Sequence, residues 1–208
     1  MNDIVLMLKQ VGAIITDSHI VYTSGKHGSV YVNKDALYPH TALSSEVGEM
    51  FAQKNKDLDI DTVVAPALGG IILSQWTAYH LSKLKGKEIF GVYTEKDSEK
   101  NQVFTRGYDR FITGKRVLVI EDLTNTGGSV LKVVSSVRNA GGTVTAVSVM
   151  VNRSPDVVNE AMMGAPFSTL GILRAEAFDE DVCPLCASGV PINTTVGHGK
   201  KYMESKKI

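Results

Sequence analysis

Residues 116–129 read RVLVIEDLTNTGGS, and this stretch decides the fold. Four apolar residues, Val117 to Ile120, stand directly before two carboxylates, Glu121 and Asp122. A turn rich in hydroxyl groups and glycine follows, and a helical pattern of apolar residues begins at Val130. Because a short apolar run bounded by a turn is typical of a strand buried on both faces, we expect a parallel strand here. This strand would deliver two acids and a tight turn to one edge of a sheet.

Length and composition limit the class of protein. The 208 residues suffice for one domain with small appendages, and a hydrophobic fraction of 43% with 21% charged residues is ordinary for an enzyme. The formal net charge is zero, so we expect neither nucleic acid nor a membrane as a partner. No apolar run approaches the roughly 18 residues that span a bilayer, and the N-terminus lacks a signal-peptide pattern. A reducing, cytoplasmic setting is the expectation.

The rest of the chain alternates between strand and helix patterns. The predicted strands lie within 62–70, 88–94, 116–122, 143–152 and 167–173. The predicted helices run from Leu43 to Phe51, from Ile72 to Gly86 and from Val130 to Gly141. Apolar strands separated by helices indicate an α/β domain with a central parallel sheet flanked by helices. In such sheets, ligands bind outside the carboxyl ends of the strands.

Three parts of the chain are expected. Residues 1–40 read as an N-terminal helix and a small hood of short strands and turns, 41–175 as the α/β core, and 176–208 as a C-terminal extension with two cysteines. Between the strands at 88–94 and 116–122 lie mostly charged and polar residues. A structureless loop of about twenty residues is unusual inside a compact domain, so a mobile lid or a hairpin is favoured over a plain surface loop.

The turn after Asp122 is suited to an anion. It consists of Leu123, Thr124, Asn125, Thr126, Gly127, Gly128 and Ser129. Successive main-chain N–H groups that lead into a helix N-terminus form an anion-binding concavity, and glycines let a phosphate approach closely. Because Glu121 and Asp122 repel phosphate, they would accept hydrogen bonds from ribose hydroxyls or act through Mg²⁺. The alternative is a strand that ends in an acidic helix cap without a ligand.

These residues carry a resemblance to a known family. VLVIEDLTNTGGS resembles the phosphoribosyl pyrophosphate (PRPP) signature of type I phosphoribosyltransferases. YTSGKHGSVYVNK (22–34) resembles the hood segment of orotate phosphoribosyltransferases, and APALGGI (65–71) resembles their pyrophosphate-side loop. VMVNR (149–153) is similar to a strand end that presents an arginine, and CPLCASGVPINT (183–194) to the ending of some bacterial members. The resemblance covers nearly the whole chain, in the same order.

The resemblance implies a reaction and roles for named residues. The family transfers a 5-phosphoribosyl group from PRPP to orotate, with Mg²⁺ and loss of pyrophosphate, in pyrimidine nucleotide biosynthesis. Thr124 to Ser129 would bind the 5-phosphate, next to Leu123 as a further substrate-binding residue, with Glu121 and Asp122 on the ribose and Arg153 on the orotate carboxylate. Mg²⁺ would arrive with PRPP, with no certain protein ligand. A cytoplasmic homodimer is also implied, in which the lid comes from the partner subunit.

The lid departs from the family pattern. Lys96 matches the first catalytic lysine of the lid, but Glu99 stands at the second lysine and Asn101 at the histidine. Lys100 or Arg106 could restore the lost positive charge. The loss leaves open the alternative of a non-catalytic PRPP-binding regulator.

Two further departures concern the substrates. Gly69 stands where many members have a lysine that binds pyrophosphate. Asn125 occupies a turn position where threonine is usual and which faces the base. This second departure leaves open a phosphoribosyltransferase for another base, a purine or uracil.

The extension contains Cys183 and Cys186, which have the spacing of half a zinc site. A structural turn with free thiols is favoured over a zinc site or a redox pair. A complete zinc site needs two more ligands, and His198 is the nearby candidate in the sequence.

The remaining histidines give weaker signals. His27 could contact the base or a phosphate, but a half-exposed position in a turn is favoured. His19, His40 and His80 show no ligand-like spacing and are interpreted as surface or core residues.

Overall fold

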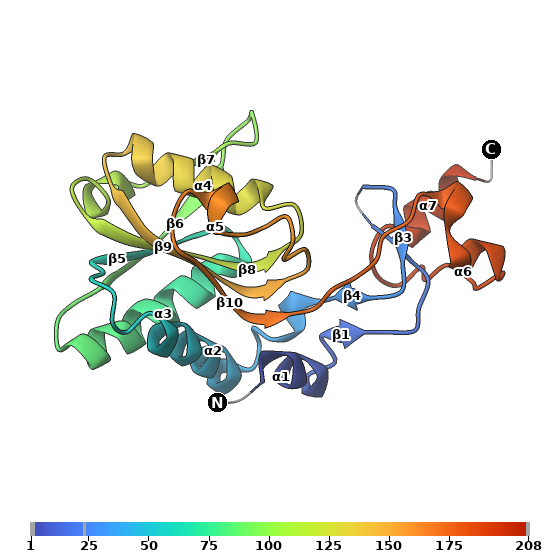
Figure 1. Ribbon diagram of the computed structural model, residues 1–208, viewed down its shortest axis with the longest axis horizontal. Coiled ribbons are helices and arrows are strands. Elements are labelled where there is room, and N and C mark those ends of the chain that lie inside the picture. Colours follow the sequence, from blue (N-terminus) through green and yellow to red (C-terminus); the bar gives the residue numbers. More distant parts are fainter. Residues whose placement is uncertain (1–2, 23, 207–208) are drawn as a thin grey trace.

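The computed structural model describes residues 3–22 and 24–206, which form a large α/β lobe and a small lobe beside it (Figure 1). The large lobe contains a six-stranded sheet. Its strands are β5 (Thr62–Pro66), β6 (Phe90–Lys96), β7 (Gln102–Val103), β8 (Arg116–Thr124), β9 (Thr143–Asn152) and β10 (Phe167–Ile172). The strand order is β10-β9-β8-β5-β6-β7, and all neighbours are parallel except β6 and β7. The predicted parallel sheet is therefore confirmed.

Helices cover both faces of this sheet. They are α1 (Ile4–Gln10), α2 (Thr41–Lys54), α3 (Gly69–Lys85), α4 (Gly128–Asn139) and the short α5 (Glu160–Met163). In β8, Leu118 and Ile120 point into the core under α1, α2 and α3, whereas Val117 and Val119 point into the core under α4. This alternation follows from the two-residue repeat of a strand and explains why the run is apolar throughout. None of the described helices has the length and apolarity that crossing a bilayer requires.

The small lobe joins segments from both ends of the chain (Figure 1). It contains two antiparallel pairs, β1 (Ile14–Ile15) with β4 (Tyr31–Val32) and β2 (Ile20–Val21) with β3 (His27–Gly28). A 3₁₀ turn, η1 (Lys34–Ala36), then leads into α2. The C-terminal extension packs on this hood through η3 (Glu180–Val182), α6 (Pro184–Ala187) and α7 (Gly199–Ser205).

The polar segment between β6 and β8 contains a hairpin. Strand β7 pairs antiparallel with the end of β6, and Lys96 lies opposite Gln102. The Asp97 carboxylate closes the turn by accepting the N–H groups of Glu99 at 2.9 Å and Asn101 at 2.8 Å. A short 3₁₀ helix, η2 (Tyr108–Phe111), lies between β7 and β8. The segment therefore contains a hairpin, one of the two forms expected for it.

Helices α2 and α3 pack closely at Gly48. A Cβ atom added there would lie 2.4 Å from Trp76 Cβ, which no ordinary contact allows. On an exposed helix, Gly→Ala stabilises by up to about 1 kcal/mol. Here we expect Gly48→Ala to lower the free energy of unfolding by about 1–3 kcal/mol, because the helices must separate. Urea denaturation measures this change, and Gln53→Ala on the exposed side of α2 is the matched control. A Gly48→Ala variant as stable as the control would contradict this packing.

Candidate active site

Polar groups gather at the carboxyl edge of the sheet. Strand β5 runs into loop 66–70, β6 ends at Lys96, and β8 presents Glu121 and Asp122 close to its end. Strand β9 pairs with β8 as far as Asn152, and the next residue, Arg153, donates its main-chain N–H to Thr124 O at 2.9 Å. Since parallel strands end at one edge, residues distant in the sequence meet there.

A cavity of about 250 Å³ opens between these strand ends. Its lining consists of Lys34, Pro66, Ala67, Leu68, Gly69, Lys96, Gln102, Glu121, Asp122, Leu123 and Ser129. The cavity therefore combines a pair of lysines, a pair of carboxylates and the start of α4. We refer to it as the donor cavity.

Asp122 is the anchor of the donor cavity. Its carboxylate is 5% exposed, accepts a hydrogen bond from the Tyr38 hydroxyl at 2.9 Å, and lies 3.1 Å from Lys34 Nζ. A Cβ atom on Gly69 would lie 2.2 Å from Asp122 Oδ2 and 2.9 Å from Lys34 Nζ. A side chain at position 69 would therefore require the Asp122 and Lys34 side chains to move, and the Lys34 ammonium lies beside this position. Sequence reasoning missed Lys34, although it ends the hood motif YTSGKHGSVYVNK.

The charges in this cavity shift one another's ionisation. Burial raises the pKa of Glu121 well above its ordinary range, and the neighbouring Asp122 charge adds to the rise. Burial by itself would lower the pKa of Lys34, but the attraction of Asp122 outweighs it and raises that pKa. Burial also raises the pKa of Tyr38, as does Asp122, so Tyr38 is held as a hydrogen-bond donor. In the folded chain, the protonated form of the Glu121 carboxyl group is therefore favoured in this cavity.

The turn from β8 to α4 has the geometry of an anion site. Thr124 ends β8, and Gly127 precedes α4 in the left-handed conformation with φ of 75°. A Cβ atom on Gly127 would lie 2.9 Å from both Cε and Sδ of Met162, so the turn needs glycine there. The first N–H groups of a helix have no partner within it and face outward. Within the described residues, the buried Thr124 hydroxyl also has no hydrogen-bond partner.

A second cavity of about 570 Å³ adjoins the donor cavity under the hood. Its lining consists of Tyr22, Ser24, Tyr31, Val32, Lys34, Leu123, Asn125, Thr126, Arg153, Gly197 and His198. Lys34 and Leu123 line both cavities, so the two spaces meet at these residues. We refer to this one as the acceptor cavity.

Arg153 is the cation of the acceptor cavity. Its guanidinium lies over the Tyr22 ring, with Cζ 4.9 Å from the ring centroid. Its buried Nε has no hydrogen-bond partner among the described residues. Next to it, Asn125 Oδ1 accepts a hydrogen bond from the Ser154 hydroxyl at 2.9 Å. A planar cation with an unused donor is suited to a planar anion.

The hairpin residues are divided between two environments. Lys96 lines the donor cavity. Arg106 forms an ion pair with Glu95 at 3.3 Å, and neither Arg106 nor Lys100 lines the donor or the acceptor cavity. Neither Lys100 nor Arg106 therefore restores the positive charge lost from the hairpin in these two cavities.

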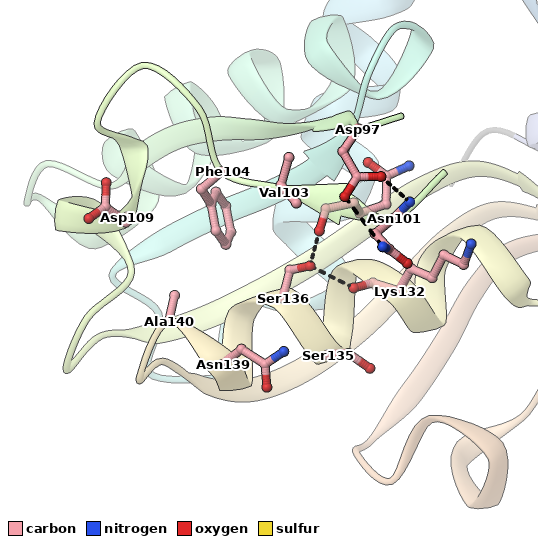
Figure 2. A pocket seen from close by; sticks show the side chains of 11 residues that line it. Asp97, Asn101, Val103, Phe104, Asp109, Lys132, Ser135, Ser136, Asn139 and Ala140 are labelled. Atoms are coloured by element: carbon pink, nitrogen blue, oxygen red, sulfur yellow. Dashed lines mark hydrogen bonds between the residues drawn. The ribbon is translucent and has the colours of Figure 1, made fainter. Parts of the chain in front are cut away.

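Another groove lies away from the sheet edge. A space of about 590 Å³ lies between the β6–β7 hairpin and α4, and Figure 2 shows its lining. Asp97 is occupied by main-chain N–H groups of its own turn, and the Ser136 hydroxyl bonds to the main-chain oxygens of Gln102 and Lys132. Because these polar groups already have partners that hold the hairpin on α4, the groove is less suited to a ligand than the two cavities at the sheet edge.

The histidines of the small lobe differ from expectation. His27 is fully buried in β3 instead of half-exposed in a turn, and His19 is 1% exposed beside it. His19 is thus a core residue, one of the two readings expected for it, but both histidines also lie beside Cys183 and Cys186, which sequence spacing had not indicated. His198 lines the acceptor cavity and is not part of this cluster. The pairing of β2 with β3 brings the two histidines together, and sequence spacing does not show that register.

Comparison with known proteins defines the class first. A family model described as the phosphoribosyl transferase domain matches residues 33–162. The fold agrees with solved structures of this class. A Mycobacterium tuberculosis orotate phosphoribosyltransferase in complex with Fe(III) dicitrate has a TM-score of 0.65 at 24% identity, over 83% of this chain and 97% of that chain. An adenine phosphoribosyltransferase from Thermoanaerobacter pseudethanolicus has a TM-score of 0.60 at 18% identity, over 80% of this chain and 99% of that chain.

Curated relatives narrow the class. The orotate phosphoribosyltransferase of Thermotoga maritima is 34% identical over 196 residues, which is 94% of this chain and 98% of the relative. That of Caldanaerobacter subterraneus is 33% identical over 179 residues, which is 86% of this chain and 88% of the relative. The chain belongs to the orotate phosphoribosyltransferase family.

The raised pKa of Glu121 predicts how stability depends on pH. Between the unfolded and the folded pKa, the folded chain binds more protons than the unfolded chain, so the free energy of unfolding falls as pH rises. The Glu121→Gln variant has no such proton to release. We therefore expect the wild type to lose more stability than Glu121→Gln between about pH 4.5 and pH 8, as measured by urea denaturation without ligand.

Glu88→Gln provides the matched control, because Glu88 is exposed. Its pH profile should run parallel to that of the wild type. A Glu121→Gln profile that is also parallel would contradict the burial of an acid at this position.

Proposed function

We propose that this chain transfers the 5-phosphoribosyl group of PRPP to orotate and releases pyrophosphate, a reaction of pyrimidine nucleotide biosynthesis. The observation that supports orotate is Arg153, which lines the cavity that adjoins the phosphate-binding turn and whose buried Nε has no partner among the described residues. Orotate carries a ring carboxylate, which a guanidinium can bind through two parallel hydrogen bonds. The relatives' names agree with this choice of base.

The donor cavity suggests how PRPP would be oriented. The turn from Thr124 to Ser129 would bind the 5-phosphate, with Thr124 Oγ1 and the α4 N-terminus as donors. Glu121 and Asp122 would accept hydrogen bonds from the ribose hydroxyls. Lys34 and Lys96 would face the pyrophosphate, next to loop 66–70. The ribose C1 would then lie near Leu123, where the two cavities meet.

Mg²⁺ fits the chemistry of this site. Glu121 and Asp122 offer carboxylate oxygens, the ligand type that Mg²⁺ prefers. The pKa of Glu121 is raised because burial and the Asp122 charge disfavour its carboxylate, and a bound cation would stabilise that carboxylate. We propose that Mg²⁺ enters with PRPP and, when bound, neutralises charge on the departing pyrophosphate.

The protein's own groups then promote bond exchange at C1. The bond from C1 to the pyrophosphate oxygen breaks with its electron pair leaving on oxygen. A ring nitrogen of orotate forms the new bond to C1 and releases its N–H proton to solvent. Lys34 and Lys96 stabilise the leaving polyanion, and Arg153 holds the incoming base in line. The hood above the acceptor cavity would exclude water, which would otherwise hydrolyse PRPP.

We also propose the wider organisation of the protein. Residues 1–40 would act as the hood unit, 41–175 as the PRPP-binding core and 176–208 as an extension that supports the hood. A homodimer would let the β6–β7 hairpin of one subunit reach the site of its partner, as the family resemblance implies.

Asn125 supports one alternative, a phosphoribosyltransferase for another base. Its side-chain oxygen accepts a hydrogen bond from the Ser154 hydroxyl, which leaves the side-chain NH₂ group as a donor for a base. Threonine would present a single hydroxyl at this position instead. A purine or uracil lacks the carboxylate, however, and would leave Arg153 without a charged partner.

A panel of bases tests the proposed function. We expect the protein with Mg²⁺ and PRPP to consume orotate in preference to uracil, adenine and xanthine. Arg153→Lys should lower kcat/KM for orotate at least about tenfold, because an ammonium cannot make the two-pronged contact. Spectrophotometric loss of orotate and release of pyrophosphate both measure this reaction.

Arg110→Lys is the control, since Arg110 is exposed on η2 and remote from both cavities. If adenine, xanthine or uracil is turned over faster than orotate, that base and not orotate is the acceptor substrate. PRPP binding by calorimetry without turnover of any base would instead indicate a regulator.

Lys34 is predicted to bind the pyrophosphate part of PRPP. A charge-assisted hydrogen bond contributes roughly 1.5–3 kcal/mol, so we expect Lys34→Gln to raise KM for PRPP about ten- to hundredfold. Lys54→Gln, at the exposed end of α2, should leave KM unchanged. Initial rates at saturating orotate measure the effect. Equal KM values for PRPP in the two variants would exclude this role for Lys34.

A further inference from the structure

Four side chains from distant parts of the chain meet inside the small lobe. His19 precedes β2, His27 lies in β3, Cys183 follows η3, and Cys186 lies in α6. Their nearest ligand atoms all lie within 4.8 Å of one another. His19, His27 and Cys183 are buried and Cys186 is partly exposed, so the cluster is shielded yet close to the surface.

The spacing of these atoms is close to that around a tetrahedral ion. His19 Nε2 lies 2.8 Å from His27 Nδ1, and Cys186 Sγ lies 3.2 Å from His27 Nδ1. Cys186 Sγ and Cys183 Sγ lie 3.6 Å and 3.8 Å from His19 Nε2. Bonds of about 2.0–2.1 Å to nitrogen and 2.3 Å to sulfur separate tetrahedral ligands by roughly 3.3–3.8 Å. The side chains therefore need only small shifts to surround Zn²⁺.

A hydrogen bond outside the cluster orients His19. Its Nδ1 lies 2.7 Å from the main-chain oxygen of Val190, which can only accept. Nδ1 therefore carries the proton, and Nε2 presents its lone pair to the other three side chains. Metal-binding histidines are usually oriented in this way by a carbonyl or a carboxylate.

Protons alone do not satisfy this cluster. The His19 Nε2 lone pair accepts one hydrogen bond, yet His27 Nδ1 and both thiols approach it. Three donors in a dry place would compete for one acceptor, at a cost in free energy. A cation at the centre removes the conflict, because it accepts one lone pair from each of the four groups.

We propose that His19, His27, Cys183 and Cys186 bind one Zn²⁺ in a closed structural site. Two imidazoles and two thiolates fill all four positions and leave none open for a substrate, as in structural zinc sites. Binding releases the two thiol protons to solvent, so Zn²⁺ and two thiolates form a centre without net charge. Such a centre can be buried at lower cost than isolated ions.

The proposed zinc would connect the two ends of the chain beside the acceptor cavity. It would link the β2–β3 hairpin to the extension, since His19 and Cys183 are 164 positions apart in the sequence. Tyr22, which follows β2 in the same hairpin, lines the acceptor cavity. The extension contributes Gly197 and His198 to the same lining. Loss of zinc should therefore loosen the base-binding side of the site more than the donor side.

Metal content of the untagged full-length chain, purified without chelator, tests the proposal. We expect about one zinc ion per chain by plasma mass spectrometry. Cys186→Ser should lose at least about tenfold in zinc content, because the second-row oxygen is a poor ligand replacement. His40→Ala is the matched control, since His40 is exposed and outside the cluster, and it should keep its zinc. A Cys186→Ser variant with undiminished zinc would place the metal elsewhere and overturn the proposal.

Measurements on the wild type guard against a variant that fails to fold. Co²⁺ added to zinc-depleted protein should produce a thiolate-to-cobalt charge-transfer band and tetrahedral d–d bands. A strong zinc chelator should lower Tm by roughly 5 °C or more. A wild-type chain without zinc and without these bands would overturn the proposal. Rapid formation of a Cys183–Cys186 disulfide in such a chain would instead identify a redox pair.

Discussion

Two adjacent carboxylates stand in a nearly dry place at the end of β8, and the rest of the structure depends on how their charge is offset. Asp122 is held by the Tyr38 hydroxyl and the Lys34 ammonium, which come from the hood side of the chain. Gly69 lets the loop after β5 approach this group without a side chain. Glu121 has no lysine and tyrosine arranged around it in this way. Its pKa is raised because burial and the neighbouring Asp122 charge both disfavour its ionised form. This arrangement supports the proposal that the site receives sugar hydroxyls and a cation.

The two cavities have different origins. The donor cavity is formed by strand ends of a parallel sheet, whose spacing varies little because the strands are hydrogen-bonded along their length. The acceptor cavity lies between that edge and the small lobe, and its walls include Tyr22, Arg153 and His198 from three separate segments. The proposed zinc site would keep these walls in place.

Much of the fold and of the donor site could be predicted from local sequence. The run from Val117 to Ile120 is apolar at every position because both faces of β8 are covered, and this alone predicts a central parallel strand. Thr124 to Ser129 shows its role through turn chemistry that operates over a few residues. Lys34 escaped notice because its partner, Asp122, is 88 positions away in the sequence, by subtraction of their residue numbers. The charge that position 69 lacks is restored in space rather than in sequence.

The sequence by itself determined the class of fold, the sugar-phosphate turn and the position of Arg153 after a strand, since each follows from patterns of neighbouring residues. Only the tertiary structure decided which groups share a cavity and which histidines join the cysteines. His19 and His27 are eight residues apart, a spacing without meaning until Val21 pairs with His27 across the β2–β3 hairpin. Cys183 and Cys186 then approach them from the opposite end of the chain. Such contacts depend on register and on packing between distant segments, which local patterns do not encode.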